Sequence, residues 1–160
     1  MRHTISVLVE NKSGVLARVS GLFSGRGYNI DSLNVAETED TTISRMTIVA
    51  RGDDRILEQI TKQLNRLVDV VKVSDMTSED HVERELVLIK VSAQARSRAE
   101  IIQIADIFRA NIVDVSHEAL VIAVTGNENK VTAMINMLRP YGVKEIARSG
   151  QVAISRGGRS

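Results

Sequence analysis

The chain has 160 residues, 43% of them hydrophobic and 26% charged, which is the balance of a soluble globular protein. This length suits one ordinary domain or two small ones. With 21 basic and 20 acidic residues, the net charge of +1 gives no general reason to expect a nucleic-acid partner.

The absence of cysteine excludes disulfides, thiol nucleophiles and thiolate metal sites. Aromatic residues make up only 2% of the chain, so a stacking surface for single-stranded nucleic acid is not expected. No apolar run approaches the roughly 18 residues of a membrane span, and the first residues lack the pattern of a secretory signal. We therefore expect a cytoplasmic protein with no membrane contact.

Apolar periodicity divides the chain into two halves with the same order of elements. In the first half, the pattern predicts a strand at 5–9, a helix at 15–23, strands at 30–35 and 43–50, a helix at 56–67 and a strand at 68–73. In the second half, it predicts a strand at 86–91, a helix at 101–108, strands at 112–115 and 120–124, a helix at 131–138 and strands at 143–147 and 152–154. Ser13 is the expected N-cap of the first helix, and Gly25 and Gly27 are expected to end it.

This order predicts an α+β fold of two ferredoxin-like βαββαβ units in tandem, each with both helices on one face of an antiparallel sheet. The expected boundaries are a first domain at 1–76, a polar linker at 77–84 and a second domain at 85–160. Units of this size bury little surface, and each sheet leaves one face and its edge strands open. We therefore expect at least a homodimer.

The turn between the first strand and the first helix carries the most chemical information. The free N–H groups and partial positive charge at a helix start suit a carboxylate. Gly14 lets a ligand approach the backbone, and the Asn11 amide can accept from an ammonium group or donate to a carboxylate. These features suit the head group of an α-amino acid, although an ordinary capped loop, which is the commoner case, also explains the turn taken by itself.

Asn29 adds a second half to this candidate site. It is predicted to begin the second strand, at one end of the sheet and near its edge. If two subunits pair side by side, the Asn29 region of one can face the Asn11–Leu16 turn of the other. A small ligand would then be enclosed by both subunits.

The runs Val9–Val19 and Leu22–Leu33 resemble the ACT domain of the small regulatory subunit of acetolactate (acetohydroxyacid) synthase. The Asn-x-x-Gly-Val-Leu turn is shared by many ACT domains, whereas the longer run with Arg-Gly-Tyr-Asn-Ile is more specific. The resemblance continues through 35–39, 44–47 and 59–73, and Arg84-Glu85-Leu86 opens a C-terminal domain typical of that family. It therefore spans nearly the whole chain.

The resemblance implies a non-catalytic subunit that binds valine, or a related branched-chain amino acid, as a feedback inhibitor at an ACT–ACT interface. It also implies activation of a separate catalytic subunit, in which thiamine diphosphate, Mg²⁺ and FAD are expected, with no cofactor in this chain. The ligand contacts that it implies are Asn11, Ser13, Gly14, Val15 and Leu16 of one subunit and Asn29 and Ile30 of its neighbour. The positions that it links to the valine response are Ala36 and Gln59.

Other patterns predict no further site. His3, His81 and His117 are far apart and lack metal-ligand spacing, and no Ser/His/Asp set or acid pair indicates catalysis. The alternative function is a stand-alone ACT-type sensor that acts on another enzyme or on a transcription regulator, but no helix-turn-helix or basic strand face supports the second case. Ligand preference among valine, leucine and isoleucine, the surface for the catalytic subunit and the role of the second domain do not follow from the sequence.

Overall fold

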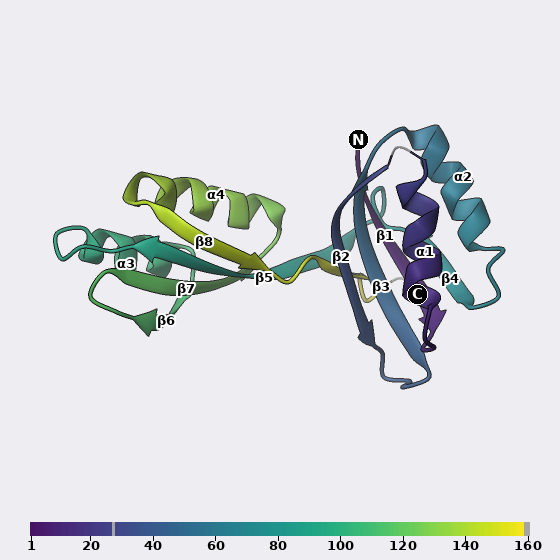
Figure 1. Cartoon of the computed structure of the whole chain (residues 1–160), viewed down its shortest axis with the longest axis horizontal. Helices are drawn as coiled ribbons and strands as arrows, with labels where there is room; N and C mark the ends of the chain where they lie inside the picture. Colours follow the sequence, from purple (N-terminus) through teal and green to yellow (C-terminus); the bar gives the residue numbers. More distant parts are fainter. Residues whose placement is uncertain (27, 159–160) are drawn as a thin grey trace. The chain divides into compact units, whose positions relative to one another are not determined.

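The computed structural model describes residues 1–26 and 28–158, and it divides into two units. The first unit contains Met1–Val82 and the segment from Gln151 onward, and the second contains Glu83–Gly150. In each unit two helices cover one face of an antiparallel sheet (Figure 1), which confirms the predicted pair of ferredoxin-like units. Gly27, one of the two glycines predicted to end the first helix, lies outside the described residues.

The first unit follows the predicted βαββαβ order. Its elements are β1 (Arg2–Glu10), α1 (Val15–Ser24), β2 (Asn29–Glu37), β3 (Ile43–Arg51), α2 (Asp54–Leu64) and β4 (Val70–Asp75). The strand order β2-β3-β1-β4 makes β2 an edge strand. The period of two places Ile5, Val7 and Val9 on the helix-covered face, where each is at most 3% exposed. Phe23 of α1 completes this core and packs edge-to-face on Tyr28, with ring centroids 6.4 Å apart.

The second unit repeats this arrangement around its own core. Its elements are β5 (His81–Ser92), α3 (Arg98–Ile107), β6 (Asn111–Val115), β7 (Ala119–Gly126), α4 (Glu128–Leu138), a 3₁₀ helix (Arg139–Tyr141) and β8 (Val143–Arg148), with strand order β6-β7-β5-β8. On β5, Val87 and Ile89 are fully buried under the helices. Leu86 and Leu88 alternate with them and are 46% and 40% exposed, so the face away from the helices is open and partly apolar.

The C-terminal segment departs from the expected boundary, which assigned residues 85–160 to the second domain. The strand β9 (Val152–Ser155) contacts β1, and it lies over the face of the first sheet that the helices leave open. The Gln151 N–H donates to Ser32 Oγ at 2.9 Å, and Ala153 is 2% exposed. Apolar alternation can identify this strand, but it carries no information about which sheet the strand covers.

The segment 77–84, expected to be a polar linker, is structured. The Thr77 hydroxyl accepts a hydrogen bond from the Thr4 N–H at 3.1 Å, and Glu79 accepts one from the Ser155 hydroxyl at 2.6 Å. The strand β5 begins inside the segment. The polar composition therefore reflects side-chain hydrogen bonds rather than a lack of structure.

Candidate functional site

Backbone hydrogen bonds hold the turn after β1 to the segments on both sides of it. The Glu10 N–H donates to the carbonyl oxygen of Asp69, and the Asn11 N–H donates to that of Thr42, both at 2.8 Å. The first bond fixes the turn to the connection before β4, and the second fixes it to the β2–β3 hairpin. The turn therefore has fixed neighbours from which a ligand site can be built.

Gly14 is the N-cap of α1, so the prediction of Ser13 as the cap was wrong. Its φ of 84° lies in the left-handed region, which glycine adopts without the steric cost that a Cβ imposes. Among residues 1–26 and 28–158 no side chain caps this end of the helix, so the N–H groups of the first turn are open to a ligand. Together with the helix dipole, they favour an anionic group such as a carboxylate.

The Asn11 side chain bridges the turn and the β2–β3 hairpin. Its Nδ2 donates to Glu37 Oε1 at 3.2 Å and to the carbonyl oxygen of Thr41 at 3.1 Å. Both bonds use the donor atom, so neither consumes the acceptor Oδ1. An asparagine held in this way can accept a hydrogen bond from an ammonium group.

Two cations flank the open helix end. A Cβ placed on Gly14 would lie 3.3 Å from Nη1 of Arg18, which forms an ion pair with Asp69. Lys12 Nζ lies 2.8 Å from Glu10 Oε2, and this hydrogen bond raises the pKa of the lysine. Arg18 was not among the residues predicted for the site, although its position one helical turn after Gly14 indicates that it lies near the turn.

The other turn residues divide into buried and exposed ones. Val15 is 3% exposed and belongs to the core of the first unit, so it anchors α1 and can offer a ligand only its backbone. Leu16 is 46% exposed and Ser13 is exposed as well. Leu16 therefore places an apolar side chain at the surface beside the open helix end.

Asn29 and Ile30 lie at the opposite end of the sheet from the turn. Asn29 pairs with Arg51, and Arg51 pairs with Arg2 at the start of β1, whereas the turn follows the end of β1. The separation is roughly eight strand residues, or about 27 Å at the rise of an antiparallel strand. Asn29 is exposed, and its Nδ2 donates to Asp31 Oδ1 at 2.6 Å. One chain therefore does not bring its own Asn29 to its own turn.

Ala36 and Gln59, which the family resemblance links to the valine response, differ in their relation to the turn. Ala36 is exposed on β2, directly before Glu37, which accepts the hydrogen bond from Asn11. Gln59 is exposed on α2, and among the described residues it forms no hydrogen bond with the turn. Ala36 thus lies near the turn by its place in the hairpin, and Gln59 is placed on a different element.

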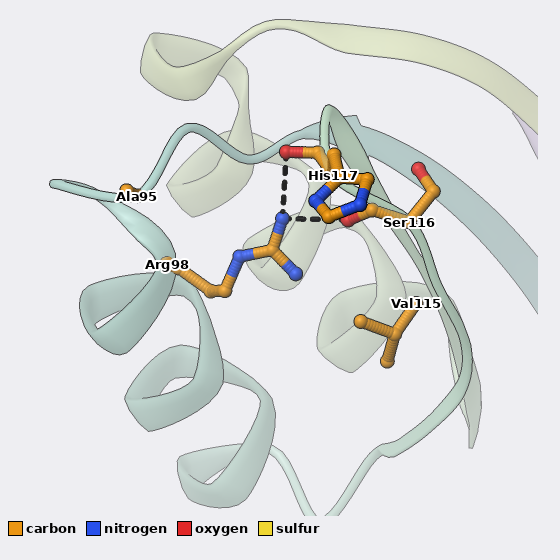
Figure 2. A pocket seen from close by; sticks show the side chains of 5 residues that line it. All are labelled: Ala95, Arg98, Val115, Ser116 and His117. Carbon is orange, nitrogen blue, oxygen red and sulfur yellow. Dashed lines mark hydrogen bonds between the residues drawn. The ribbon is translucent and has the colours of Figure 1, made fainter.

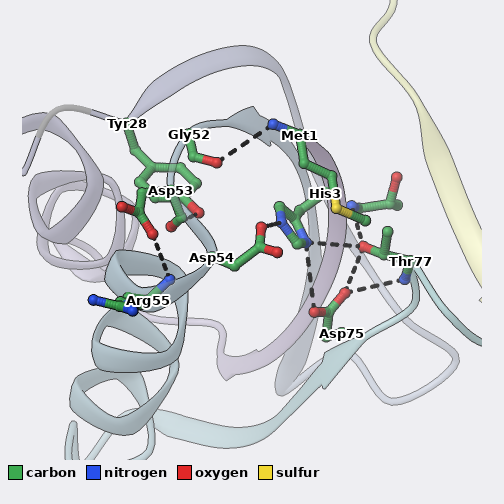
Figure 3. A network of polar contacts seen from close by, with 10 residues as sticks. Met1, His3, Tyr28, Gly52, Asp53, Asp54, Arg55, Asp75 and Thr77 are labelled. Carbon is green, nitrogen blue, oxygen red and sulfur yellow. Dashed lines mark hydrogen bonds and ion pairs between the residues drawn. The ribbon is translucent and has the colours of Figure 1, made fainter.

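A polar network that residue spacing did not predict surrounds the buried His3, near the start of β1 (Figure 3). His3 is 5% exposed, and its Nε2 lies 2.7 Å from Asp54 Oδ1, while its Nδ1 lies 3.4 Å from Thr77 Oγ1. The Thr77 hydroxyl also donates to Asp75 Oδ1 at 2.6 Å. These residues are far apart in sequence, and within residues 1–26 and 28–158 no group of three metal-ligating side chains comes together. The contacts explain the network as a structural tie between β1, α2 and the end of β4.

Comparison with known proteins decides the family. An AHAS small subunit-like ACT domain matches residues 5–72, and the family described as the small subunit of acetolactate synthase matches residues 84–157. This chain belongs to the acetolactate synthase small-subunit family. The first unit is therefore an ACT domain, and the second corresponds to the C-terminal part of the family's small subunits.

Individual relatives cover nearly the whole chain. The probable acetolactate synthase small subunit of Archaeoglobus fulgidus is 58% identical over 157 residues, which are 98% of either chain. The acetolactate synthase small subunit of Mycobacterium bovis is 55% identical over 157 residues, 98% of this chain and 94% of its own. The crystal structure of the small subunit from Thermotoga maritima is 47% identical, has a TM-score of 0.86 and covers 98% of both chains. None of the helices in the described part of the chain has the length and apolar character of a membrane span.

Proposed function

We propose that the chain is the regulatory subunit of an acetolactate synthase and that it binds valine, or a related branched-chain amino acid, between two ACT domains. The observation that carries this proposal is the uncapped start of α1 at Gly14, with the Asn11 amide fixed three residues before it. The N–H groups suit the carboxylate of an amino acid, and Asn11 Oδ1 suits its ammonium group. Leu16, half exposed beside them, suits an aliphatic side chain.

The edge strand β2 offers a geometric route to a complete site. Two copies paired antiparallel through β2 about a two-fold axis would place the Asn29 end of one strand opposite the Glu37 end of the other. Since Glu37 accepts a hydrogen bond from Asn11, this pairing would bring Asn29 and Ile30 of the second copy to the Asn11 turn. It would also pair the open backbone groups of β2 and cover Val35, which is 41% exposed.

The energy that such a site must supply is modest. Valine has about eight non-hydrogen atoms, and a dissociation constant near 0.1 mM needs about 5.5 kcal/mol, or roughly 0.7 kcal/mol per atom. A helix start, two asparagines and a small apolar contact are enough for that value. The affinity therefore requires no further charged ligand group from the protein.

Regulation requires that valine binds two arrangements of the subunits with different affinities. Valine bound at the interface would favour the arrangement that holds the two ACT domains together around it. The coupling is reciprocal, so docking to the catalytic subunit must change the affinity for valine by the same factor by which valine changes docking. In this proposal the catalytic subunit carries thiamine diphosphate, Mg²⁺ and FAD, and this chain contributes only the ligand site and the signal.

Mixing two variants tests whether two copies share the site. Asn11→Asp impairs the turn and Asn29→Ala impairs the contact from the second copy, so each homodimer is expected to bind valine weakly. A mixed dimer has one intact site, formed by the turn of one chain and Asn29 of the other. We expect calorimetry to show that valine binding returns on mixing; a site contained in one chain would give no recovery.

The regulatory role is tested on the complex. The isolated chain is expected to form no acetolactate, and adding it to the catalytic subunit is expected to raise activity, which valine then lowers. Calorimetry with valine, leucine and isoleucine ranks the ligands. No heat from any of the three at millimolar concentration would contradict the amino-acid site, and no effect of the chain on the catalytic subunit would contradict the regulatory role.

A further inference from the structure

The second unit repeats the backbone frame of the turn that follows β1. The Ser92 N–H donates to the carbonyl oxygen of Gly142, and the Ala93 N–H donates to that of Glu118, both at 2.8 Å. These are the counterparts of the two hydrogen bonds that hold the Asn11 turn to its neighbours, and they have the same length. The connection between β5 and α3 therefore occupies the same place in its unit as the Asn11 turn does in the first.

The side chain that bridges this connection and the adjacent hairpin is different. Ala93 stands where Asn11 stands in the first unit, and it has no polar side chain. The bridge is instead made by Arg98, the first residue of α3 (Figure 2). Its Nη2 donates to the carbonyl oxygens of Ala93 at 2.9 Å, Ser116 at 2.6 Å and His117 at 3.0 Å. A cation thus replaces a neutral amide.

The guanidinium of Arg98 is held in position but is not neutralised. All three of its acceptors are backbone carbonyls, and in the part of the chain that the structure describes Arg98 forms no ion pair with a carboxylate. Nε and Nη1 take no part in these bonds, so their N–H groups are available to an anion. A cation fixed in this way loses little conformational freedom when it binds an anion.

The guanidinium lines a recess in the surface of the second unit. The recess has a volume of about 400 Å³ and is lined by Ala95, Arg98, Val115, Ser116 and His117. This volume lies in the range of small-molecule sites, about 300–1,000 Å³. Figure 2 shows the guanidinium between the start of α3 and the β6–β7 hairpin, with the His117 ring close to it.

We propose that this recess binds a small anion, a carboxylate or a phosphate that carries no ammonium group. Arg98 supplies the positive charge, and the His117 ring beside it can add a donor. An α-amino acid is disfavoured because its ammonium group would lie beside the guanidinium. The site lies within the second unit, and its existence does not depend on what the Asn11 turn binds.

Nuclear magnetic resonance of the full ¹⁵N-labelled chain tests the proposal with acetate and inorganic phosphate as probes and sodium chloride at matched ionic strength as reference. We expect saturable shifts of the amides of residues 93–98 and 115–118 with at least one probe, and the comparison of the two identifies the preferred anion class. Arg98→Gln is expected to weaken binding by roughly ten-fold or more. Arg96→Gln is the matched control, because Arg96 is exposed, lies two residues away and is not part of the recess.

A thiol-protection experiment keeps the proposal testable if Arg98→Gln perturbs the fold. The chain has no cysteine, so an Ala95→Cys variant carries a single thiol at the edge of the recess, and exposed Ser78→Cys serves as the control. The preferred anion is expected to slow alkylation by iodoacetamide at position 95 and not at position 78. Three results of the resonance experiment would overturn the proposal: no saturable shifts, equal losses of anion affinity in Arg96→Gln and Arg98→Gln, or equal shifts of these amides by valine. Alkylation at position 95 that the anion does not slow would also overturn it.

Discussion

Asn11 donates its side-chain Nδ2 to the carbonyl oxygen of Thr41 at 3.1 Å, so that one amide fixes both the turn after β1 and the β2–β3 hairpin. The adjacent backbone N–H of Asn11 donates to Thr42 in the same hairpin. The position of the amide is therefore set by the hairpin as well as by the turn. A change at Asn11 alters both the proposed ligand contact and its support.

We expect Asn11→Asp to weaken valine binding by about ten-fold or more, since a carboxylate lacks the Nδ2 donor that binds Glu37 and Thr41 and is repelled by Glu37, which displaces the acceptor from the ligand ammonium group. Asn65→Asp is the matched control. Asn65 is also exposed, and its Nδ2 donates to the carbonyl oxygen of Thr61 at the same distance of 3.1 Å, but at the end of α2. Calorimetry of both variants checks the prediction, and equal losses would speak against a contact at Asn11.

Substitutions of Gly14 separate backbone strain from charge. Gly14→Ala is strained by the φ of 84°, at a cost of about 1–2 kcal/mol of stability, whereas Gly14→Asp adds a negative charge at the proposed carboxylate seat. We expect valine affinity to fall in both variants and to fall roughly ten-fold further in Gly14→Asp. Calorimetry on folded samples of the two proteins gives the comparison. Binding in Gly14→Asp as strong as in Gly14→Ala would contradict the proposed orientation of the ligand.

Replacing two glycines of the first unit by alanine is expected to change the free energy of unfolding in opposite directions. A Cβ on Gly52 would lie 2.8 Å from ring carbons of Tyr28, a 5% exposed side chain whose hydroxyl donates to the carbonyl oxygen of Asp53. Gly52→Ala should therefore lower the free energy of unfolding by about 1–3 kcal/mol. Gly21 is inside α1 with nothing within 4 Å, so Gly21→Ala should raise it by about 0.5–1 kcal/mol. Urea unfolding of both variants measures the two changes.

Two ion pairs of the second unit should differ in their contribution to stability. Glu85 is 4% exposed and accepts hydrogen bonds from Arg148 at both carboxylate oxygens, so Arg148→Gln leaves a buried carboxylate without its partner. We expect a loss of about 2–4 kcal/mol, reduced from that of a wholly buried pair because the Arg148 side chain is 46% exposed. Lys90 and Glu145 form an exposed pair at 2.6 Å, and Lys90→Gln should change stability little. Thermal unfolding compares the stabilities of the Arg148→Gln and Lys90→Gln variants. Adding Glu85→Gln to Arg148→Gln should recover part of the lost stability.

The β2–β3 hairpin should weaken in acid. Hydrogen bonds from the hydroxyl and backbone N–H of Thr42 hold the pKa of Asp40 below its ordinary value of 3.8. Because the folded-state pKa is lowered, the stabilisation is fully present above the unfolded-state pKa and is lost as the pH falls through the lower folded-state value. The Thr42 amide shift should therefore follow the titration of Asp40 below pH 3.8, and Asp40→Asn should remove this dependence. A Thr42 shift that is independent of pH in this range would contradict the prediction.

Most elements could be predicted because their apolar spacing is set by the face that they bury. Ile5, Val7 and Val9 all face one core, so alternation alone identifies β1. The N-cap of α1 was assigned to Ser13 because serine is a common cap, but the left-handed backbone at Gly14 moves the cap by one residue. Backbone torsion is not encoded in apolar spacing.

Contacts between distant segments could not be predicted from one sequence. His3 reaches Asp54 and Thr77 only because β1, α2 and the end of β4 meet at one end of the sheet. Arg98 reaches the β6–β7 hairpin in the same way, across 19 sequence positions to His117. For the candidate site, the turn and Asn29 were both identified from sequence, but the register was needed to show that they lie at opposite ends of one sheet.

The return of the C-terminal segment to the first unit has a consequence for synthesis. A ribosome finishes the second unit before it adds Gln151 and Ala153, which become buried on the first sheet. Until then, that face of the nascent ACT domain remains exposed to water. The face carries the hydroxyl groups of Thr4, Ser6 and Thr47, which water can hydrate until the strand arrives. These hydroxyl groups limit the apolar surface, which includes Leu8 and Val49, that the nascent domain exposes during translation.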